Sequence, residues 1–227
     1  MMRGREITLP TKKELGYLVG LFAGDGYSIH DKNSRHYTVE FFLNSLRDID
    51  IQTFLLKILS SMNLFPNITK DKRFNCNRIR VYSKLFFNLI VKKFVYSRDF
   101  KLGFVSGLID SDGYYNKKKS HIEIVNTNKK LLLKAKRFLT SLRIDSTVRK
   151  RVKSRKDRLI SYRLYISIKF IRLKNVSIKK VFTILLLPQT AANSASLEIN
   201  ISVSNAFLPH RASYKIPLGS PINQLFF

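Results

Sequence analysis

An internal repeat constrains the fold of this chain more than any other feature of its sequence. Residues 15–27 (LGYLVGLFAGDGY) and residues 102–114 (LGFVSGLIDSDGY) align without a gap at an offset of 87, and seven of the thirteen positions are identical. A repeat of this kind predicts two copies of one structural unit rather than a single unrepeated domain. Each copy carries the same acidic residue, Asp25 in the first and Asp112 in the second.

Both copies are expected to fold through the same order of elements. Residues 13–23 and 101–111 are apolar or glycine on nearly every turn, which predicts a buried helix that ends at a glycine. In the first copy we expect strands over 37–43, 67–72 and 78–83 and further helices over 49–62 and 84–94. In the second copy we expect strands over 120–126, 146–153 and 162–169 and helices over 129–142 and 172–186. With a hairpin strand after each first helix, the order is αββαββα, which predicts a mixed α+β fold.

The offset also predicts the domain boundaries. Adding 87 to the start of the second motif gives residue 189, where the second copy should end. We therefore expect an N-terminal half over residues 1–98, a C-terminal half over 99–188 and an appended tail over 189–227. The tail contains only two basic residues, Arg211 and Lys215. The short stretch between the copies leaves little room for a linker, so the two halves should pack closely.

Small residues form a ridge on each repeated helix, with Gly16 and Gly20 in the first and Gly103 and Gly107 in the second. A glycine inside a helix costs about 0.5–1 kcal/mol relative to alanine, so a repeated set needs a compensating reason. Close approach of the two helix backbones would supply it. The alternative is that each ridge packs against its own sheet, but the same ridge on the same face in both copies favours pairing.

Pairing the two helices would bring Asp25 and Asp112 together at the helix C-terminal ends. Carboxylates there face the negative end of the helix dipole and repel each other. Such a site calls for a cation, and a small set of oxygen ligands favours Mg²⁺ completed by water and substrate phosphates. An isolated Asp-Gly would be a routine turn. Two of them at matched helix ends favour a metal site instead.

The charge of the chain indicates a polyanionic partner. Lys and Arg number 42 against 15 acidic residues, which gives a formal charge of +27 and makes nucleic acid the leading candidate. The single Cys76 excludes an internal disulfide framework, and four scattered histidines lack zinc-ligand spacing. Neither an apolar run of eighteen residues nor a secretory signal is present, so we expect an intracellular protein that is neither membrane-bound nor secreted. The abundance of Phe, Tyr, Ile, Asn and Lys would suit an AT-rich organellar genome.

Residues 18–26 (LVGLFAGDG) and 105–113 (VSGLIDSDG) resemble the two motifs of the LAGLIDADG homing endonucleases, in the single-chain form that carries both. The resemblance covers about residues 10–188. It implies a pseudo-twofold saddle of antiparallel sheets that lie in the DNA major groove on either side of the paired helices. It further implies a monomeric, intron-encoded endonuclease that hydrolyses double-stranded DNA with Mg²⁺ at a long, partly palindromic target. Mn²⁺ or Ca²⁺ could occupy the same site.

The family's functional residues can be placed on this sequence position by position. The metal-binding acids fall on Asp25 and Asp112, and the preceding residues, Gly24 and Ser111, would lend backbone carbonyls. The earlier acid of the motif is Asp110 in the second copy, but its place in the first copy is taken by alanine. Basic residues that support catalysis beside the phosphates would be Lys93 and Lys180, which recur at the same offset of 87.

The strands supply candidates for DNA contact. Basic residues at a period of two point to one face of an extended strand. Arg and Asn can read guanine and adenine edges, whereas Lys more often contacts phosphate. The alternative is a solvated charged face, although an acid-poor sheet face is hard to explain without a polyanion, whose binding would weaken with salt. The candidates are Lys32, Asn33, Arg35, Arg78, Arg80, Tyr82, Lys117, Lys118, Lys119, Arg149, Arg151, Lys153, Arg155, Arg163 and Tyr165.

Two other functions fit the same fold. One is an RNA-binding maturase that assists intron splicing, with intron RNA as its partner, and the other is a DNA-binding regulator that does not cleave. The two retained acids favour the nuclease, because a protein that only binds has no use for a repulsive acidic pair.

Overall fold

The computed structural model of the chain describes residues 7–31, 36–71, 75–92, 96–116, 118–151 and 160–167. In these ranges no helix is long and apolar enough to cross a membrane. The expected helix over 172–186 and the tail over 189–227 lie outside the described residues, so the three-part division of the chain stays a prediction. The same holds for eight of the candidate site residues, which are Lys32, Asn33, Arg35, Lys93, Lys117, Lys153, Arg155 and Lys180.

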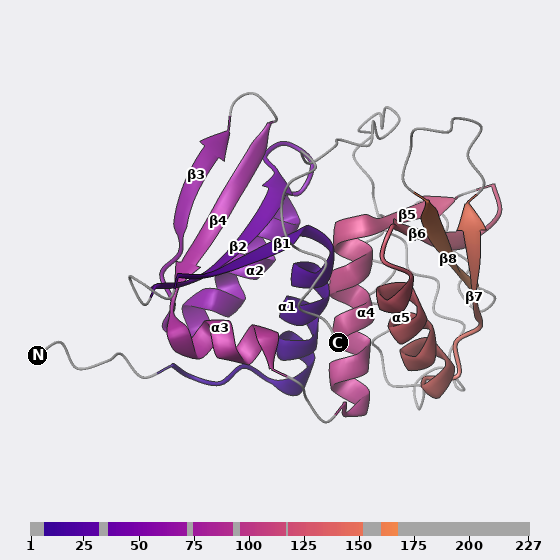
Figure 1. The fold of residues 1–227 in the computed structure, drawn as a ribbon, viewed down its shortest axis with the longest axis horizontal. Helices are drawn as coiled ribbons and strands as arrows, with labels where there is room; N and C mark the ends of the chain where they lie inside the picture. The colour runs from indigo at the N-terminus through magenta and orange to yellow at the C-terminus, as the bar shows by residue number, and fades with distance from the viewer. Residues whose placement is uncertain are drawn as a thin grey trace, which may run out of the picture. The chain divides into compact units, whose positions relative to one another are not determined.

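The described part of the chain is a mixed α+β fold with two antiparallel four-stranded sheets (Figure 1). The elements of the first half are α1 (Lys12–Asp25), β1 (Gly26–Asp31), β2 (His36–Asn44), α2 (Ile49–Ser61), β3 (Asn67–Asp71), β4 (Cys76–Tyr82) and α3 (Lys84–Val91). Those of the second half are α4 (Arg98–Asp112), β5 (Gly113–Asn116), β6 (His121–Asn126), α5 (Lys129–Ser141), β7 (Ser146–Arg151) and β8 (Ser161–Ser167). The strand orders, β1-β2-β4-β3 and β5-β6-β8-β7, are the same in both halves.

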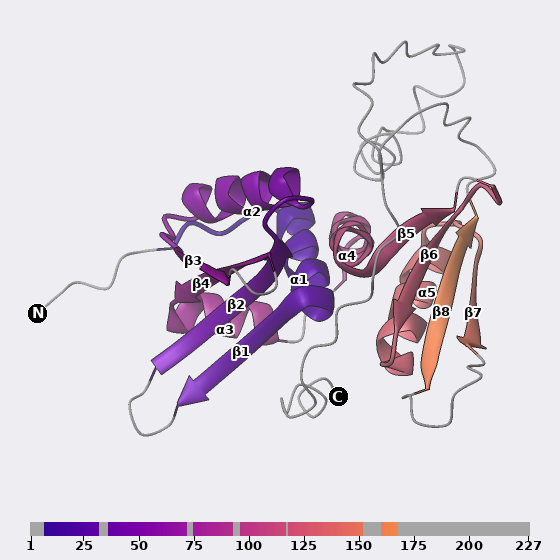
Figure 2. The ribbon, with the colours of Figure 1, turned by 90° about the horizontal axis from the view of Figure 1, so that it is seen from above.

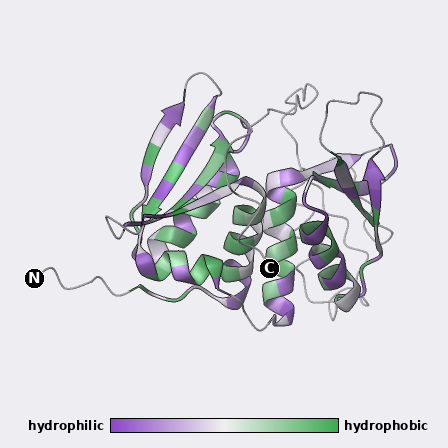
Figure 3. Cartoon of the chain, in the orientation of Figure 1, coloured by the Kyte–Doolittle hydropathy of each residue, from purple (hydrophilic) through white to green (hydrophobic). Residues whose placement is uncertain are grey.

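Each sheet turns one face to a helical core. In the central strand β2 the side chains of Val39, Phe41 and Leu43 are almost fully buried at alternate positions. Ile79 and Val81 of β4 are buried in the same way, and the strands alternate between hydrophobic and hydrophilic residues (Figure 3). This alternation leaves the intervening residues on the opposite face of the sheet.

Helices α1 and α4 lie side by side between the two sheets (Figure 2). A side chain at Gly16 or Gly20 would come within 3.0 Å of the α4 backbone, and one at Gly103 or Gly107 would come within 3.0 Å of the α1 backbone. Real Cβ atoms essentially never approach other atoms that closely. The backbones can therefore touch only because these four positions lack a side chain.

Each motif helix ends one residue before a glycine, but not through the left-handed cap that a glycine often forms there. Gly26 has φ −103° and ψ 156°, and Gly113 has φ −82° and ψ 149°, so both are extended and begin a strand. A Cβ on Gly26 would collide with Phe22 of its own helix, and one on Gly113 would collide with Ile109. The glycines are needed for this close approach, which lets β1 and β5 leave directly from the helix ends.

Candidate functional site

The two repeated acids are the last residues of α1 and α4. Where these ends meet, a Cβ on Gly24 would collide with the Ser111 side chain and lie 3.3 Å from Asp112 Oδ2. Asp112 therefore reaches the backbone of the first motif beside Asp25. Both carboxylates are half-buried at the negative ends of helix dipoles, where an added cation would be favoured.

The oxygen donors at this site fit a hard divalent cation. No group of three or more His, Cys, Asp or Glu side chains able to hold a metal occurs in the described ranges. Two carboxylates leave most coordination positions to water and to phosphate oxygens, which is how Mg²⁺ is usually bound. Carbonyl ligation by Gly24 and Ser111 stays a prediction; the Ser111 hydroxyl donates to Leu108 O at 3.0 Å.

One acid has a side-chain partner that the sequence did not identify. Asn126, at the end of β6, donates from Nδ2 to Asp112 Oδ2 at 2.7 Å. Its Oδ1 accepts the N–H of Asn128, also at 2.7 Å, which fixes the orientation of the amide. The strand registers place Leu43 at the equivalent position of the first half, where it is buried. The sequence did contain a signal for this contact, because the matched run of the first half ends in leucine where the second ends in asparagine.

A second asymmetry joins the two helices. The phenol of Tyr17 on α1 donates to Asp110 Oδ2 on α4 at 2.8 Å. The equivalent of Tyr17 in the second copy is Phe104, and the equivalent of Asp110 in the first copy is Ala23. These two residues cannot form the bond. Burial and the neighbouring Asp110 carboxylate both raise the pKa of Tyr17, so the phenol stays protonated and remains a donor. Because only the second copy keeps this acid, the hydrogen bond between Tyr17 and Asp110 has no symmetric counterpart in the helix interface.

Tyr17→Phe should lower the free energy of unfolding by about 1–3 kcal/mol, because the half-buried Asp110 carboxylate loses a charge-assisted hydrogen bond. Chemical denaturation of the parent and the variant measures the loss. Phe104→Tyr is the reciprocal variant: Phe104 is buried and alanine at position 23 offers no acceptor, so the unpaired hydroxyl should lower stability rather than raise it. Equal stability of the parent and Tyr17→Phe would show that the bond contributes nothing.

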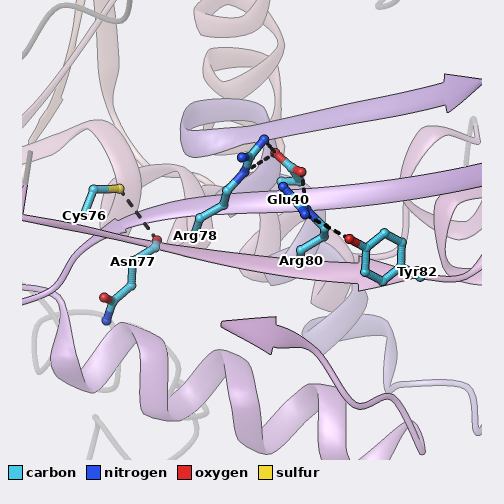
Figure 4. A network of polar contacts seen from close by, with 6 residues as sticks. All are labelled: Glu40, Cys76, Asn77, Arg78, Arg80 and Tyr82. Atoms are coloured by element: carbon cyan, nitrogen blue, oxygen red, sulfur yellow. Dashed lines mark hydrogen bonds and ion pairs between the residues drawn. The ribbon is translucent and has the colours of Figure 1, made fainter. Parts of the chain in front are cut away.

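On the first sheet, a buried acid pairs with two of the candidate DNA-contact arginines (Figure 4). The Glu40 side chain on β2 is 0% exposed. Its Oε2 accepts from Arg78 Nε at 2.8 Å and lies 2.8 Å from Arg78 Nη2, and its Oε1 accepts from Arg80 Nε at 2.6 Å. Arg80 Nη1 also donates to Tyr82 Oη at 2.9 Å. These residues share one face of the sheet, while the neighbouring Asn77 points to α2 and donates to Gln52.

The second sheet repeats the buried acid with different partners. Glu123 on β6 lies 2.8 Å from Arg163 Nη1 and 2.7 Å from His121 Nε2. Asn116 Nδ2 donates to it at 3.2 Å. The Tyr165 ring lies 5.8 Å below the guanidinium groups of both Arg149 and Arg163. The remaining candidates in the described ranges are exposed, with Arg151 at the end of β7 and Lys118 and Lys119 in the turn after β5.

Sequence reasoning identified the arginines but missed Glu40 and Glu123. A signal was present, because these acids occupy the same place in the matched runs 37–43 and 120–126 of an acid-poor chain. Their partners are set by strand pairing, which the sequence does not specify.

The pKa of Glu123 gives an acid-stability prediction. Burial raises this pKa, but hydrogen bonds from His121 and Asn116 and the charge of Arg163 outweigh burial, so the pKa lies below that of an ordinary glutamate. The resulting stabilisation is full above the ordinary pKa of about 4.3 and is lost as the pH falls through the lower folded-state value. Melting temperatures of the parent and Glu123→Gln should therefore differ at pH 6 and converge in acid. A constant difference from pH 6 to pH 3 would contradict this.

Two family models match the chain. Residues 99–173 match the LAGLIDADG-like domain, and residues 15–86 match the WhiA LAGLIDADG-like domain. Together they cover well over half of the sequence and include both repeated motifs. No curated protein matches.

Solved structures of two kinds resemble the fold. I-DmoI in complex with DNA and Ca has a TM-score of 0.54 at 24% identity, over 70% of this chain and 85% of that one. I-DmoI with DNA and Mn has a TM-score of 0.53 at 25% identity, over 69% and 90%. Full-length DUF199/WhiA from Thermatoga maritima has a TM-score of 0.53 at 19% identity, over 82% and 60%.

Proposed function

Because this chain belongs to the LAGLIDADG family, we propose that it is a divalent-metal-dependent endonuclease that cuts double-stranded DNA at a specific site. The observation that carries the proposal is the packing of α1 on α4, which brings one acid from each copy to the same place. A net charge of +27 and arginines on both sheets supply the attraction for DNA. The resemblance to I-DmoI complexes that hold DNA with Ca or Mn supports both the substrate and the metal.

Asp25 and Asp112 would hold the cation at the junction of the helices. A Mg²⁺ held by these acids would supply Lewis-acid chemistry, since a bound divalent cation can polarise a phosphodiester and lower the pKa of a water molecule. Asn126 fixes the orientation of the Asp112 carboxylate through its 2.7 Å hydrogen bond. The bond from Tyr17 to Asp110 ties α1 to α4 two residues before Asp112, which preserves the spacing of the two acids.

The asymmetry of the site favours a partly palindromic target. The halves share their strand order, so one bound chain would offer a sheet to each half of a DNA site. They differ in the residues around the acids, because Asn126 and Asp110 have no polar equivalent in the first copy. A single chain with two unlike halves would act as a monomer on two unlike half-sites.

A plasmid library that carries randomised inserts tests this proposal. The purified chain should linearise a small subset of plasmids with Mg²⁺ and none in EDTA. An even loss of all plasmids would indicate non-specific cleavage, and no linear product at any Mg²⁺ concentration would contradict the nuclease.

A DNA-binding protein that does not cleave is the second candidate. The match of residues 15–86 to the WhiA LAGLIDADG-like domain favours this candidate. The two candidates separate in the same library, since such a protein would retain particular sequences in a binding assay but leave every plasmid intact.

A further inference from the structure

Glu40 and Glu123 occupy equivalent places in the two sheets. Strand pairing sets Glu40 opposite Tyr27 and Glu123 opposite Tyr114, and these tyrosines are the final residues of the two repeated motifs. Both acids lie on the sheet face that points away from the core, since the residues on either side of each are buried against the helices. The same acid is therefore built into both copies at the same register position, opposite the last residue of the motif.

Each acid is buried and paired with at least one arginine. Glu40 is 0% exposed, whereas the side chains of Arg78 and Arg80 that cover it are 39% and 25% exposed. Glu40 engages Nε and Nη2 of Arg78 and Nε of Arg80, so the inner edge of each guanidinium is fixed. A guanidinium carries five N–H donors, so each arginine has more donors than its contacts with Glu40 and Tyr82 use.

An acid at this place opposes binding of a polyanion. Glu40 and Glu123 each neutralise arginine charge beside them, which weakens attraction to phosphate. Burying a carboxylate also carries a desolvation cost that its ion pairs must offset. A residue that lowers affinity but holds an arginine in one orientation contributes to selectivity rather than to affinity.

We propose that Glu40 and Glu123 are positioning residues that fix the sheet arginines for reading base edges, so that each acid sets the sequence preference of one half-site. The inference rests on the proposed recognition of DNA and names the residues that would determine its specificity. Arg78 and Arg80 would read one half-site as a pair. In the other half-site Glu123 would hold Arg163, with His121 and Asn116 as its other partners.

Glu40→Gln keeps the size of the side chain and removes its charge. Released from Glu40, the arginines can turn to phosphates, so non-specific DNA binding should tighten. The slope of log affinity against log salt concentration should steepen by about one. Base preference at the positions read by Arg78 and Arg80 should fall roughly tenfold or more, since a bidentate contact discriminates by that order. Preferences in the other half-site should not change.

Binding selection from a randomised DNA library tests the inference for the parent, Glu40→Gln and Glu123→Gln. EDTA in every step prevents cleavage, so the result does not depend on nuclease activity. We expect the two variants to relax opposite halves of the selected sequence, each serving as the other's control. In an Arg78→Ala/Arg80→Ala background, Glu40→Gln should cause no further relaxation, because its effect acts through those arginines.

Unchanged preference in Glu40→Gln, or equal relaxation of both halves, would overturn the inference. If Glu40→Gln does not fold, as judged by circular dichroism, Glu40→Asp replaces it. Aspartate keeps the charge but is one methylene shorter, so it should not reach both arginines, and the same base positions should relax while the arginines stay intact. Selection by the parent without any Mg²⁺-dependent cutting would remove the nuclease proposal and leave this inference standing. If the parent selects no sequence, both fall.

Discussion

Asp25→Asn is expected to reduce DNA cleavage by more than about 100-fold while the chain still folds and binds DNA. Asparagine has nearly the same shape as aspartate but lacks the charge that would hold a divalent cation beside Asp112. Loss of a residue that only supports a metal ligand typically costs 10–100-fold, so loss of a ligand should cost more. Binding should be retained or strengthened, because one negative charge near the phosphates is removed.

Asp112→Asn should have a comparable effect, and Asn126→Leu provides a graded control. This change gives the second half the residue that stands at the equivalent place in the first, and it removes the hydrogen bond to Asp112 together with the one from the Asn128 N–H. A loss of about 10–100-fold is expected for it. Time courses of plasmid linearisation, with binding measured in parallel, give the ranking. Cleavage by Asp25→Asn at the parent rate would remove Asp25 from the catalytic site.

Gly20→Ala should lower the free energy of unfolding by roughly 1–3 kcal/mol, although alanine favours helix by about 1 kcal/mol. The new methyl group would meet the carbonyl of Phe104 in α4, and rigid backbone cannot move aside as a side chain can. Gly107→Ala should behave in the same way, because its methyl would meet the carbonyl of Tyr17 in α1. Urea denaturation of each variant measures the change.

Ser60→Ala is the matched control for these helix substitutions. Ser60 is exposed on α2, so the change brings the propensity gain of alanine without a clash, and stability should stay equal or rise slightly. If Gly20→Ala were also neutral or stabilising, the two helices could not be packed as closely as the structure has them.

The repeat predicted the part of the fold that depends on local sequence. The helix expected over 13–23 is α1, and the small residues at every fourth position indicated that it pairs with its counterpart. The extended glycine at each helix end was not foreseen, because the same Asp-Gly sequence also fits a left-handed cap. The distinction depends on where the next strand begins, and β1 and β5 begin at once.

The contacts that distinguish the two halves could not be predicted, since each joins residues that only strand register or helix packing brings together. Glu40 is 38 residues from Arg78, and Tyr17 is 93 residues from Asp110. The replacement of the motif's earlier acid by Ala23 showed that the copies differ. The hydrogen bond from Tyr17 to Asp110, the acid that remains, depends on how the two helices pack. The acids and arginines were visible in the sequence, but their partnership was not.

The ends of the cleaved DNA distinguish a site-specific endonuclease from a protein that only binds DNA. The parent chain is incubated with the randomised plasmid library and Mg²⁺, and both new ends of every linear product are sequenced. We expect one recurring pair of cuts, one on each strand, at the centre of a long site whose halves are similar but not identical. These ends should disappear in EDTA and with Asp25→Asn. Ends scattered over unrelated sequences, or the same ends produced by Asp25→Asn, would contradict the proposed endonuclease.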